Sequence, residues 1–186
     1  MTQNFSVCLY CGSRNGSDPE FANAAETFGR ELARRGHRLV YGAGDVGLMG
    51  IAARAAQDAG GPVTGIIPQH LVDMEVGKAD LDEYIVTPDM HVRKKAMFDK
   101  ADAVVALPGG PGTLDELIEV LTWRQLGLHT KPLVVLNTSG YWNPLLALLR
   151  HTVDHGFADR SVLGFLTIAA TPEGALDRIE DLLRIE

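Results

Sequence analysis

Two short stretches of this sequence carry residue types that could act on a phosphorylated substrate. The first is Pro-Gly-Gly-Pro-Gly-Thr-Leu-Asp-Glu at 108–116, where three glycines and a threonine open a predicted helix. Backbone N–H groups at a helix start bind anions, because they lack intrahelical partners and lie at the positive end of the helix dipole. We place Glu116 in the first turn of that helix, pointing toward the same mouth. A carboxylate there could stabilise an oxocarbenium-like transition state, or activate a water, in glycosidic cleavage.

The second stretch is a basic cluster at the start of a predicted helix over 90–100. It contains His91, Arg93, Lys94 and Lys95. Basic side chains at a helix start oppose the helix dipole, so their placement is easier to understand if an anion binds nearby. A solvated basic face would have the same composition. The cluster is the best source of a cation for the glycine-rich turn.

A further glycine-rich turn, Gly42 to Gly47, matches the G-x-G-x-x-G pattern of dinucleotide-binding loops. It follows the second predicted strand rather than the first, and no acidic residue ends the next strand about 20 residues later. Close packing, with a phosphate or ribose contact, is therefore favoured over NAD binding. The turn at 108–113 is not a Walker P-loop either, since no lysine precedes Thr113. A phosphate monoester fits it better than a triphosphate, and no cofactor is expected.

The cysteines and histidines do not indicate a metal site. Cys8 and Cys11 form a C-x-x-C pair without a second pair, which favours two small buried residues at a strand end over a redox pair or half of a zinc site. His151 and His155 share a helical spacing but have no acidic or thiolate companions. We therefore expect no metal ligands.

The elements that must position these residues alternate short apolar runs with amphipathic patterns, which is typical of a parallel sheet covered by helices. The sequence predicts a Rossmann-like, three-layer α/β fold, with a central parallel sheet flanked by helices, as one domain over 1–186. The predicted strands are 5–11, 38–41, 62–67, 84–87, 103–107 and 133–136. The first predicted helix starts at a capping box, Ser17–Glu20. Further helices are predicted over 47–59, 90–100, 144–155 and 172–183, and over the segment after Thr113, whose core face has Leu114, Leu117, Ile118 and Leu121.

Composition narrows the possible partners. The chain has 186 residues, 46% of them hydrophobic, and a net charge of −7. Such an acidic chain offers no broad positive field for nucleic acid or an anionic membrane. The first residues lack the basic start and apolar stretch of a signal peptide. We expect a soluble, cytoplasmic protein.

Taken together, the motifs resemble the LOG (Lonely Guy) family, whose members often carry the older label "lysine decarboxylase". Met90-His91-x-Arg93-Lys94 and Pro108-Gly109-Gly110-x-Gly112-Thr113-x-x-Glu116 are similar to the family's signature. Further similar segments begin at Cys8, Tyr41, Thr122 and Lys131, so the resemblance covers nearly the whole chain. The resemblance implies that the protein hydrolyses the N-glycosidic bond of cytokinin riboside 5′-monophosphates or AMP. The products would be the free base and ribose 5-phosphate, and neither a metal nor a cofactor would be needed.

The resemblance also implies roles for individual residues. Arg93 and Glu116 would be the catalytic pair, and the phosphate would be held by Gly109, Gly110, Gly112 and Thr113. The substrate site would comprise Glu75, Arg93, Lys94, Gly110, Pro111, Gly112, Thr113, Leu114, Asp115, Glu116 and Thr122. Family members are homodimers or larger, with the helix around Arg93 near the subunit interface.

Three positions depart from the family pattern. Pro111 removes one backbone N–H from the turn, Ala43 stands where glycine is common, and Arg14 stands where a smaller residue is frequent and could add a phosphate contact. The alternative function is a nucleotide-binding protein without turnover, which would need the glycines but not the pair of Arg93 and Glu116. A decarboxylase using pyridoxal phosphate would need a Schiff-base lysine with an acidic partner for the pyridine nitrogen, and none of the lysines has that context.

Overall fold

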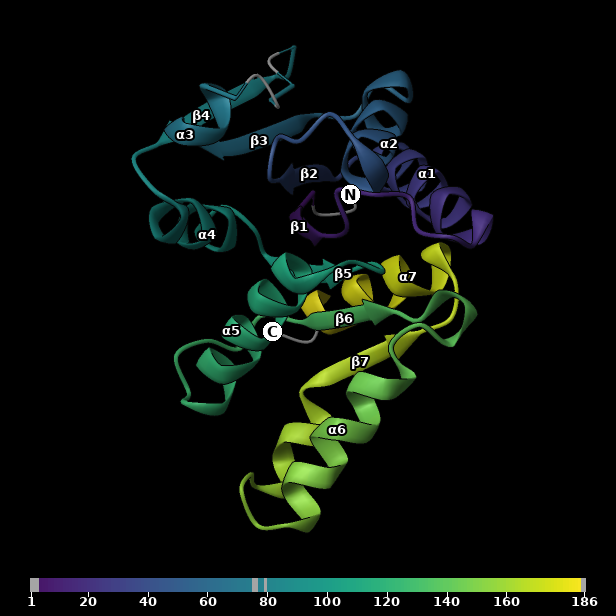
Figure 1. Ribbon diagram of the computed structural model, residues 1–186. Helices are drawn as coiled ribbons and strands as arrows, with labels where there is room; N and C mark the ends of the chain where they lie inside the picture. Colours follow the sequence, from purple (N-terminus) through teal and green to yellow (C-terminus); the bar gives the residue numbers. More distant parts are fainter. Residues whose placement is uncertain (1–3, 75–76, 79, 185–186) are drawn as a thin grey trace.

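The computed structural model describes residues 4–74, 77–78 and 80–184 (Figure 1). At its centre lies a seven-stranded parallel sheet with the order β4-β3-β2-β1-β5-β6-β7. The prediction of a Rossmann-like fold is confirmed. The strands are β1 (Ser6–Tyr10), β2 (Arg38–Tyr41), β3 (Val63–Pro68), β4 (Glu83–Thr87), β5 (Ala103–Ala106), β6 (Leu133–Leu136) and β7 (Leu166–Ala169).

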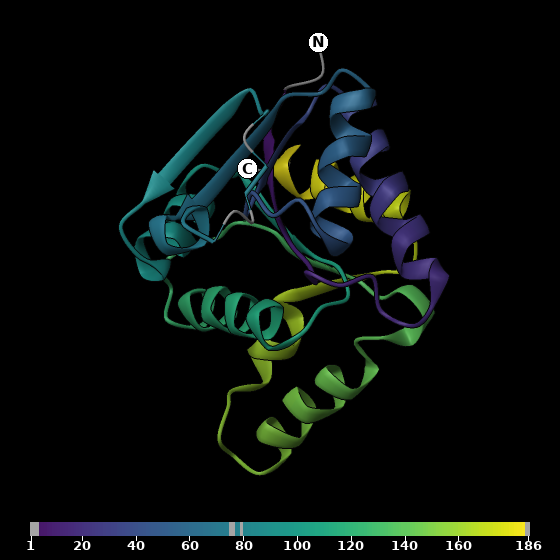
Figure 2. The same cartoon turned by 45° about the horizontal axis from the view of Figure 1, so that its top comes forward.

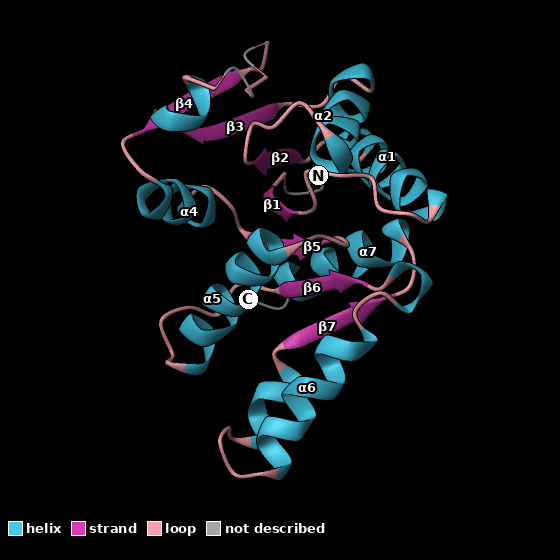
Figure 3. Ribbon diagram, in the orientation of Figure 1, coloured by secondary structure: helices cyan, strands magenta, loops and turns pink. Residues whose placement is uncertain are grey.

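Helices cover both faces of this sheet (Figure 3). The α-helices are α1 (Pro19–Arg34), α2 (Gly47–Asp58), α3 (Gln69–Val72), α4 (Met90–Asp99), α5 (Pro111–Gln125), α6 (Asn143–Asp154) and α7 (Pro172–Arg184). Two short 3-10 helices, η1 (Thr138–Gly140) and η2 (Arg160–Gly164), flank α6. None of the helices in the described part of the chain is long and apolar enough to cross a lipid bilayer.

The two faces of the sheet have separate hydrophobic cores because alternate residues of a strand point to opposite sides. Val7 and Leu9 of β1 pack with α1, α2 and α7, whereas Cys8 and Tyr10 pack with α4 and α5. Figure 2 shows α1 and α2 on one side of the sheet and α4 and α5 on the other. Residues 7–10 of β1 and the apolar run of β5 are buried in the middle of this sandwich.

The strand order places the functional loops together. The chain winds outward from β1 to β4, crosses back to β5 beside β1, and winds outward again to β7. In parallel sheets the crevice at such a reversal, outside the carboxyl ends of the strands, is the usual ligand site. The loops after β1 and β5 meet there, since Tyr10 pairs with Ala106 in register.

Local signals explain the helix boundaries, with one correction. The α1 cap is Asp18, whose carboxylate accepts a hydrogen bond from the N–H of Glu20 at 2.9 Å, and Pro19 is the first helical residue. The predicted capping box from Ser17 is therefore wrong by one residue. An Asp directly before a Pro at the first position satisfies the same orphan N–H groups.

Three other expectations about the elements are corrected. The short strand β7, the helix α3 and the two 3-10 helices were not predicted. Helix α5 starts at Pro111, so Glu116 lies in its second turn rather than its first. Leu114 and Ile118, placed on the core face by their spacing, are 38% and 37% exposed. The inward face of α5 includes the predicted Leu117 and Leu121, and it also carries Thr113, Glu116 and Val120.

The close packing of α1 on α2 gives a stability prediction. A Cβ added at Gly29 of α1 would lie 2.1 Å from the carbonyl oxygen of Ala52 in α2. Alanine normally stabilises a helix interior by about 1 kcal/mol relative to glycine. Here we expect Gly29→Ala to lower the free energy of unfolding by about 1–3 kcal/mol, as overpacking does. Urea unfolding measures this change.

The matched control is Gly164→Ala, because a Cβ at Gly164 meets no atom within 4 Å. That variant should unfold at nearly the same urea concentration as the parent protein. Equal stability of the two variants would show that α1 and α2 can move apart without lowering the free energy of unfolding.

Candidate functional site

The centre of the site is a buried ion pair between two helices. The Arg93 guanidinium of α4 donates from Nη1 to Oε1 of Glu116 in α5, and each side chain is 10% exposed. Arg93 Nε also donates to the carbonyl oxygen of Ile66 in β3, at 3.3 Å. Burial raises the pKa of Glu116, and the neighbouring Arg93 charge opposes that rise. The pair therefore holds an ionisable carboxylate at the crevice between β1 and β5.

Gly42, at the end of β2, makes the room for the Arg93 guanidinium. A Cβ on Gly42 would lie 1.7 Å from Nη2 of Arg93. The next residue, Ala43, is buried and has a φ of 56°, a left-handed conformation that is uncommon for a side chain with a Cβ. The sequence pattern gave no indication that Gly42 and Arg93 touch.

Packing also accounts for the rest of the G-x-G-x-x-G turn. A Cβ on Gly47 would lie 2.2 Å from the carbonyl carbon of Ser13, so this glycine lets α2 approach the loop after β1. Leu48 N donates to the carbonyl oxygen of Gly12 at 3.1 Å. The start of α2 thus holds the β1 loop in place, in keeping with the packing role favoured from the sequence.

The glycine-rich loop after β5 is fixed from two sides. Gly12 N donates to the carbonyl oxygen of Pro108 at 3.0 Å. The Tyr141 hydroxyl donates to the carbonyl oxygen of Gly109 at 2.5 Å. Gly110 precedes the first helical residue of α5, and no side chain in the described part of the chain caps this helix start. The N–H groups of Gly112 and Thr113 therefore belong to a helix N-terminus that is available for an anion.

Two adjoining cavities open onto this loop. The inner one, of about 210 Å³, contains Arg93 and Glu116 in its wall, and the outer one, of about 520 Å³, is walled by Arg14, Phe21 and Tyr141 among others. Both are bordered by Gly12, Ser13, Gly110 and Pro111. The only charged residues in their described walls are Arg14, Arg93 and Glu116.

The structure brings most, but not all, of the predicted site residues to these cavities. Arg93, Glu116 and the glycine-rich loop from Gly109 to Thr113 border them. Lys94 is buried beside the site, where its Nζ pairs with Asp115 at 2.9 Å and with Glu119 at 3.2 Å.

Two of the remaining candidates, Leu114 and Thr122, lie on the exposed side of α5 together with Asp115. The Thr122 hydroxyl donates to the carbonyl oxygen of Ile118 at 2.7 Å. Glu75 lies outside the described residues. Of the basic cluster, His91 and Lys95 are exposed, and Lys95 pairs with Asp99 one turn away.

The thiols near the site are free and buried. Burial raises the pKa of Cys8 to about 12 and raises that of Cys11 further above the ordinary value. Such thiols stay protonated and unreactive at neutral pH. The interpretation of Cys8 and Cys11 as small buried residues is confirmed. Among the described residues no group of three or more His, Cys, Asp or Glu side chains could hold a metal ion.

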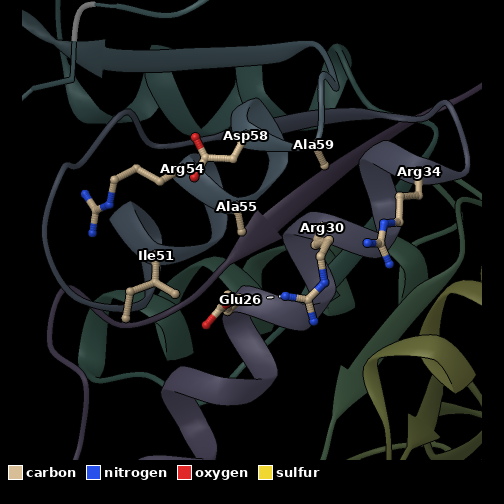
Figure 4. Close-up of a pocket in the computed structure, with 8 residues that line it drawn as sticks. All are labelled: Glu26, Arg30, Arg34, Ile51, Arg54, Ala55, Asp58 and Ala59. Atoms are coloured by element: carbon tan, nitrogen blue, oxygen red, sulfur yellow. Dashed lines mark hydrogen bonds and ion pairs between the residues drawn. The ribbon is translucent and has the colours of Figure 1, made fainter.

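A separate hollow between α1 and α2 contains three arginines but differs from the crevice in its charge balance (Figure 4). Arg30 pairs with Glu26 at 3.0 Å, Arg34 pairs with Glu31 at 2.9 Å, and Arg54 pairs with Asp45 at 2.7 Å. Each cation of this hollow thus has a carboxylate partner. The hollow also lies away from the carboxyl ends of the central strands, where ligands usually bind in such sheets, so we do not assign the substrate site to it.

Comparisons of this sequence with protein families and with individual proteins point to the same family. Residues 49–179 match the protein family described as "Possible lysine decarboxylase". A protein of Oryza sativa subsp. japonica, named probable cytokinin riboside 5′-monophosphate phosphoribohydrolase LOGL2, is 42% identical over 94% of this chain and 72% of its own length. The Arabidopsis thaliana protein named cytokinin riboside 5′-monophosphate phosphoribohydrolase LOG3 is 41% identical over 94% and 81%, respectively.

Solved structures share the fold. The Moco carrier protein from Chlamydomonas reinhardtii superposes with a TM-score of 0.75 at 22% identity, over 99% of this chain and 100% of that one. DNA processing protein A from Helicobacter pylori has a TM-score of 0.60 at 17% identity, over 97% and 81%. At these identities the likeness is one of fold alone.

The buried pair gives a prediction for stability and its pH dependence. Removing Arg93 as Arg93→Met leaves Glu116 as a buried charge without a partner, which costs about 3–5 kcal/mol at neutral pH. Because the pKa of Glu116 is already raised, the folded state binds its proton more tightly than the unfolded state, so stability falls as the pH rises through that pKa. Urea unfolding of Arg93→Met should therefore show a larger loss at pH 8 than at pH 5.

Adding Glu116→Gln to Arg93→Met should recover most of the loss at pH 8, because the double variant has no buried charge. The control Arg54→Met breaks the half-exposed pair with Asp45 and should change little. A pH-independent loss in Arg93→Met would mean that packing, not charge, is what Arg93 contributes.

Proposed function

This chain belongs to the LOG family of cytokinin riboside 5′-monophosphate phosphoribohydrolases, and on that premise we propose that it hydrolyses the N-glycosidic bond of cytokinin riboside 5′-monophosphates, of AMP, or of both. The products are the free base and ribose 5-phosphate. The observation that carries the proposal is the buried Glu116 carboxylate, held by Arg93 in a cavity that adjoins an uncapped helix N-terminus.

In the proposed mechanism Glu116 acts at the anomeric carbon. Its Oε1 accepts from Arg93, and the hydrogen bonds of the described residues leave Oε2 free in the wall of the inner cavity. The ionised carboxylate stabilises positive charge that develops at C1′ as the bond to the base nitrogen breaks, and it orients the water that attacks C1′. Water supplies the hydroxyl to C1′ and a proton to the departing base.

Arg93 positions that carboxylate. Its guanidinium donates to the carbonyl oxygen of Ile66 and fits beside Gly42, so it directs Oε1 of Glu116. Its charge also opposes the rise that burial causes in the pKa of that carboxyl group. The phosphate of the substrate would lie over the N–H groups at the start of α5, with Gly109, Gly110, Gly112 and Thr113 around it. Neither role needs a cofactor.

The decarboxylase in the description of the matched family has no support from the lysines of this chain. Lys78, Lys95 and Lys100 form ion pairs with Asp80, Asp99 and Glu83, and Lys94 is held by two carboxylates. Lys131 donates to two backbone carbonyls at 2.7 Å. None of the five borders the two cavities, where a Schiff-base lysine would have to lie.

We propose that the protein acts as a homodimer through the outer face of α4 and α5. Val92, Leu114 and Ile118 are 37–44% exposed on these neighbouring helices, and Leu126 beyond α5 is 67% exposed. Apolar side chains grouped on one face are typical of protein interfaces. The same face carries Thr122 and Asp115, and Asp115 pairs with the buried Lys94, so a partner there would lie beside the substrate and complete its site.

We also propose a cytoplasmic location and a single functional domain over the chain. The free thiols of Cys8 and Cys11 are consistent with a reducing compartment. One continuous sheet joins the first and last described strands. Microscopy of a fluorescent fusion and limited proteolysis test these two points.

The function is tested by base release. The purified protein is incubated with AMP, with isopentenyladenosine 5′-monophosphate and with the corresponding nucleosides, and free base is measured by chromatography. We expect release from at least one monophosphate. Glu116→Gln should lower kcat by at least about 100-fold, as loss of an acid–base group does, while calorimetry still detects nucleotide binding. Glu173→Gln, an exposed carboxylate in the first turn of α7, serves as the control.

The pH profile provides a second readout of the same group. Glu116 must be ionised, and burial raises its pKa, so kcat should rise with pH through a midpoint above the ordinary value for a glutamate. Nucleotide binding by the parent protein without release of base from any of the monophosphates would leave the alternative, a binding protein without turnover.

The dimer prediction is checked by sedimentation equilibrium. Ile118→Asp places a charge in the proposed interface and should shift the protein to monomers. Leu148→Asp introduces the same charge at a 56% exposed leucine of α6 and should leave the dimer intact. Dissociation by Leu148→Asp but not by Ile118→Asp would move the interface to α6.

A further inference from the structure

Among the described residues that wall the two cavities, one cation has no carboxylate partner. Arg93 is neutralised by Glu116, and Lys94, outside the cavity walls, is neutralised by Asp115 and Glu119. Arg14, in the wall of the outer cavity, makes no ion pair with any described residue. Since a phosphate monoester brings about two negative charges at neutral pH, the dipole of α5 alone, equivalent to roughly half a charge, compensates only part of them.

The backbone of Arg14 is fixed beside the glycine-rich loop. The residue two positions before it, Gly12, donates to the carbonyl oxygen of Pro108 at 3.0 Å and accepts from Leu48 N at 3.1 Å. Gly47 has a φ of 61°, and a Cβ there would lie 2.3 Å from the backbone N of Arg14. These contacts hold the peptide of Arg14 against the start of α2. The exposed side chain therefore begins from a fixed point at the cavity rim.

The outer cavity lies at the correct end of α5 for a phosphate. Gly110 and Glu116 are six residues apart, so the start of the helix lies roughly 9 Å along its axis from the level of the carboxylate. A ribose with C1′ beside Glu116 extends its 5′-carbon toward that helix start. The phosphate then reaches the border shared by the two cavities, where Gly110 and Pro111 lie.

Tyr141 fixes the peptide between Gly109 and Gly110. Its hydroxyl binds the Gly109 carbonyl, and the carbonyl and the following N–H of a trans peptide point in opposite directions. The N–H of Gly110 is therefore turned away from Tyr141. Since Pro111 has no N–H, the anion site has one donor fewer than a turn with another residue there, which increases the need for a side-chain cation.

We propose that Arg14 determines specificity for a phosphorylated substrate, by binding the 5′-phosphate dianion at the start of α5. This inference rests on the proposed function, because it assigns one part of the same substrate. The planar guanidinium can donate two parallel hydrogen bonds to two phosphate oxygens, whereas an ammonium group acts as a point charge without that fixed fork. Arg14 is thus a binding residue and takes no part in the chemistry at C1′.

The experiment compares Arg14→Ser and Arg14→Lys with the parent enzyme. For the best monophosphate, Arg14→Ser should raise KM at least tenfold and change kcat less than threefold. The inhibition constants for ribose 5-phosphate and inorganic phosphate should rise by a similar factor, whereas inhibition by free adenine should not change. Arg14→Lys should lie between the two, since it restores the charge but not the two-point contact. Arg150→Ser removes an exposed arginine of α6 as the matched control.

Three results would overturn the inference. One is an unchanged inhibition constant for ribose 5-phosphate in Arg14→Ser. Another is an equal effect of Arg150→Ser, which would indicate general charge attraction. The third is a fall in kcat with KM unchanged. If the parent protein releases no base, the proposed function fails, but calorimetric titration of ribose 5-phosphate into the parent and Arg14→Ser still decides whether Arg14 binds phosphate.

Discussion

A buried ion pair between two helices holds this site together and constrains its surroundings. Transferring the charges of Arg93 and Glu116 out of water costs several kcal/mol for each ion, and their attraction compensates only if the geometry is good and the remaining donors are satisfied. The Ile66 carbonyl satisfies one of those donors. The pair thus links β3 and α4, from one half of the fold, to α5, from the other.

The strand order explains why the pair can form. Helices α4 and α5 lie on the same face of the sheet and flank the reversal between β1 and β5, so their side chains meet above the strand ends. Two of the glycines around this point let a backbone segment and one large cation approach closely. Gly42 is adjacent to a guanidinium and Gly47 to a peptide, although the spacing of the motif by itself resembles a dinucleotide loop.

The sequence predicted the fold, and it placed Glu116 and the basic cluster around Arg93 near one glycine-rich turn, because these features follow from local patterns. Buried parallel strands are continuous apolar runs, and a glycine-rich turn before a helix indicates an anion site whatever surrounds it. What sequence could not predict depends on neighbours distant in the chain. The spacing of Leu114 and Ile118 fits a core face as well as an exposed apolar one, and only the position of α4 and the sheet distinguishes them. The sequence did not distinguish Ser17 from Asp18 as the cap of α1 either, because both side chains can accept a hydrogen bond from the same N–H group.

The contact between Gly42 and Arg93 affects how this family of sequences can change over time. While the arginine is present, any side chain at position 42 collides with it, so selection on the arginine also protects the glycine. Once a descendant loses Arg93, position 42 is free to acquire a larger residue, and the arginine can no longer return by a single substitution. Loss of the arginine therefore takes one substitution, whereas its recovery after a change at position 42 requires two coordinated substitutions.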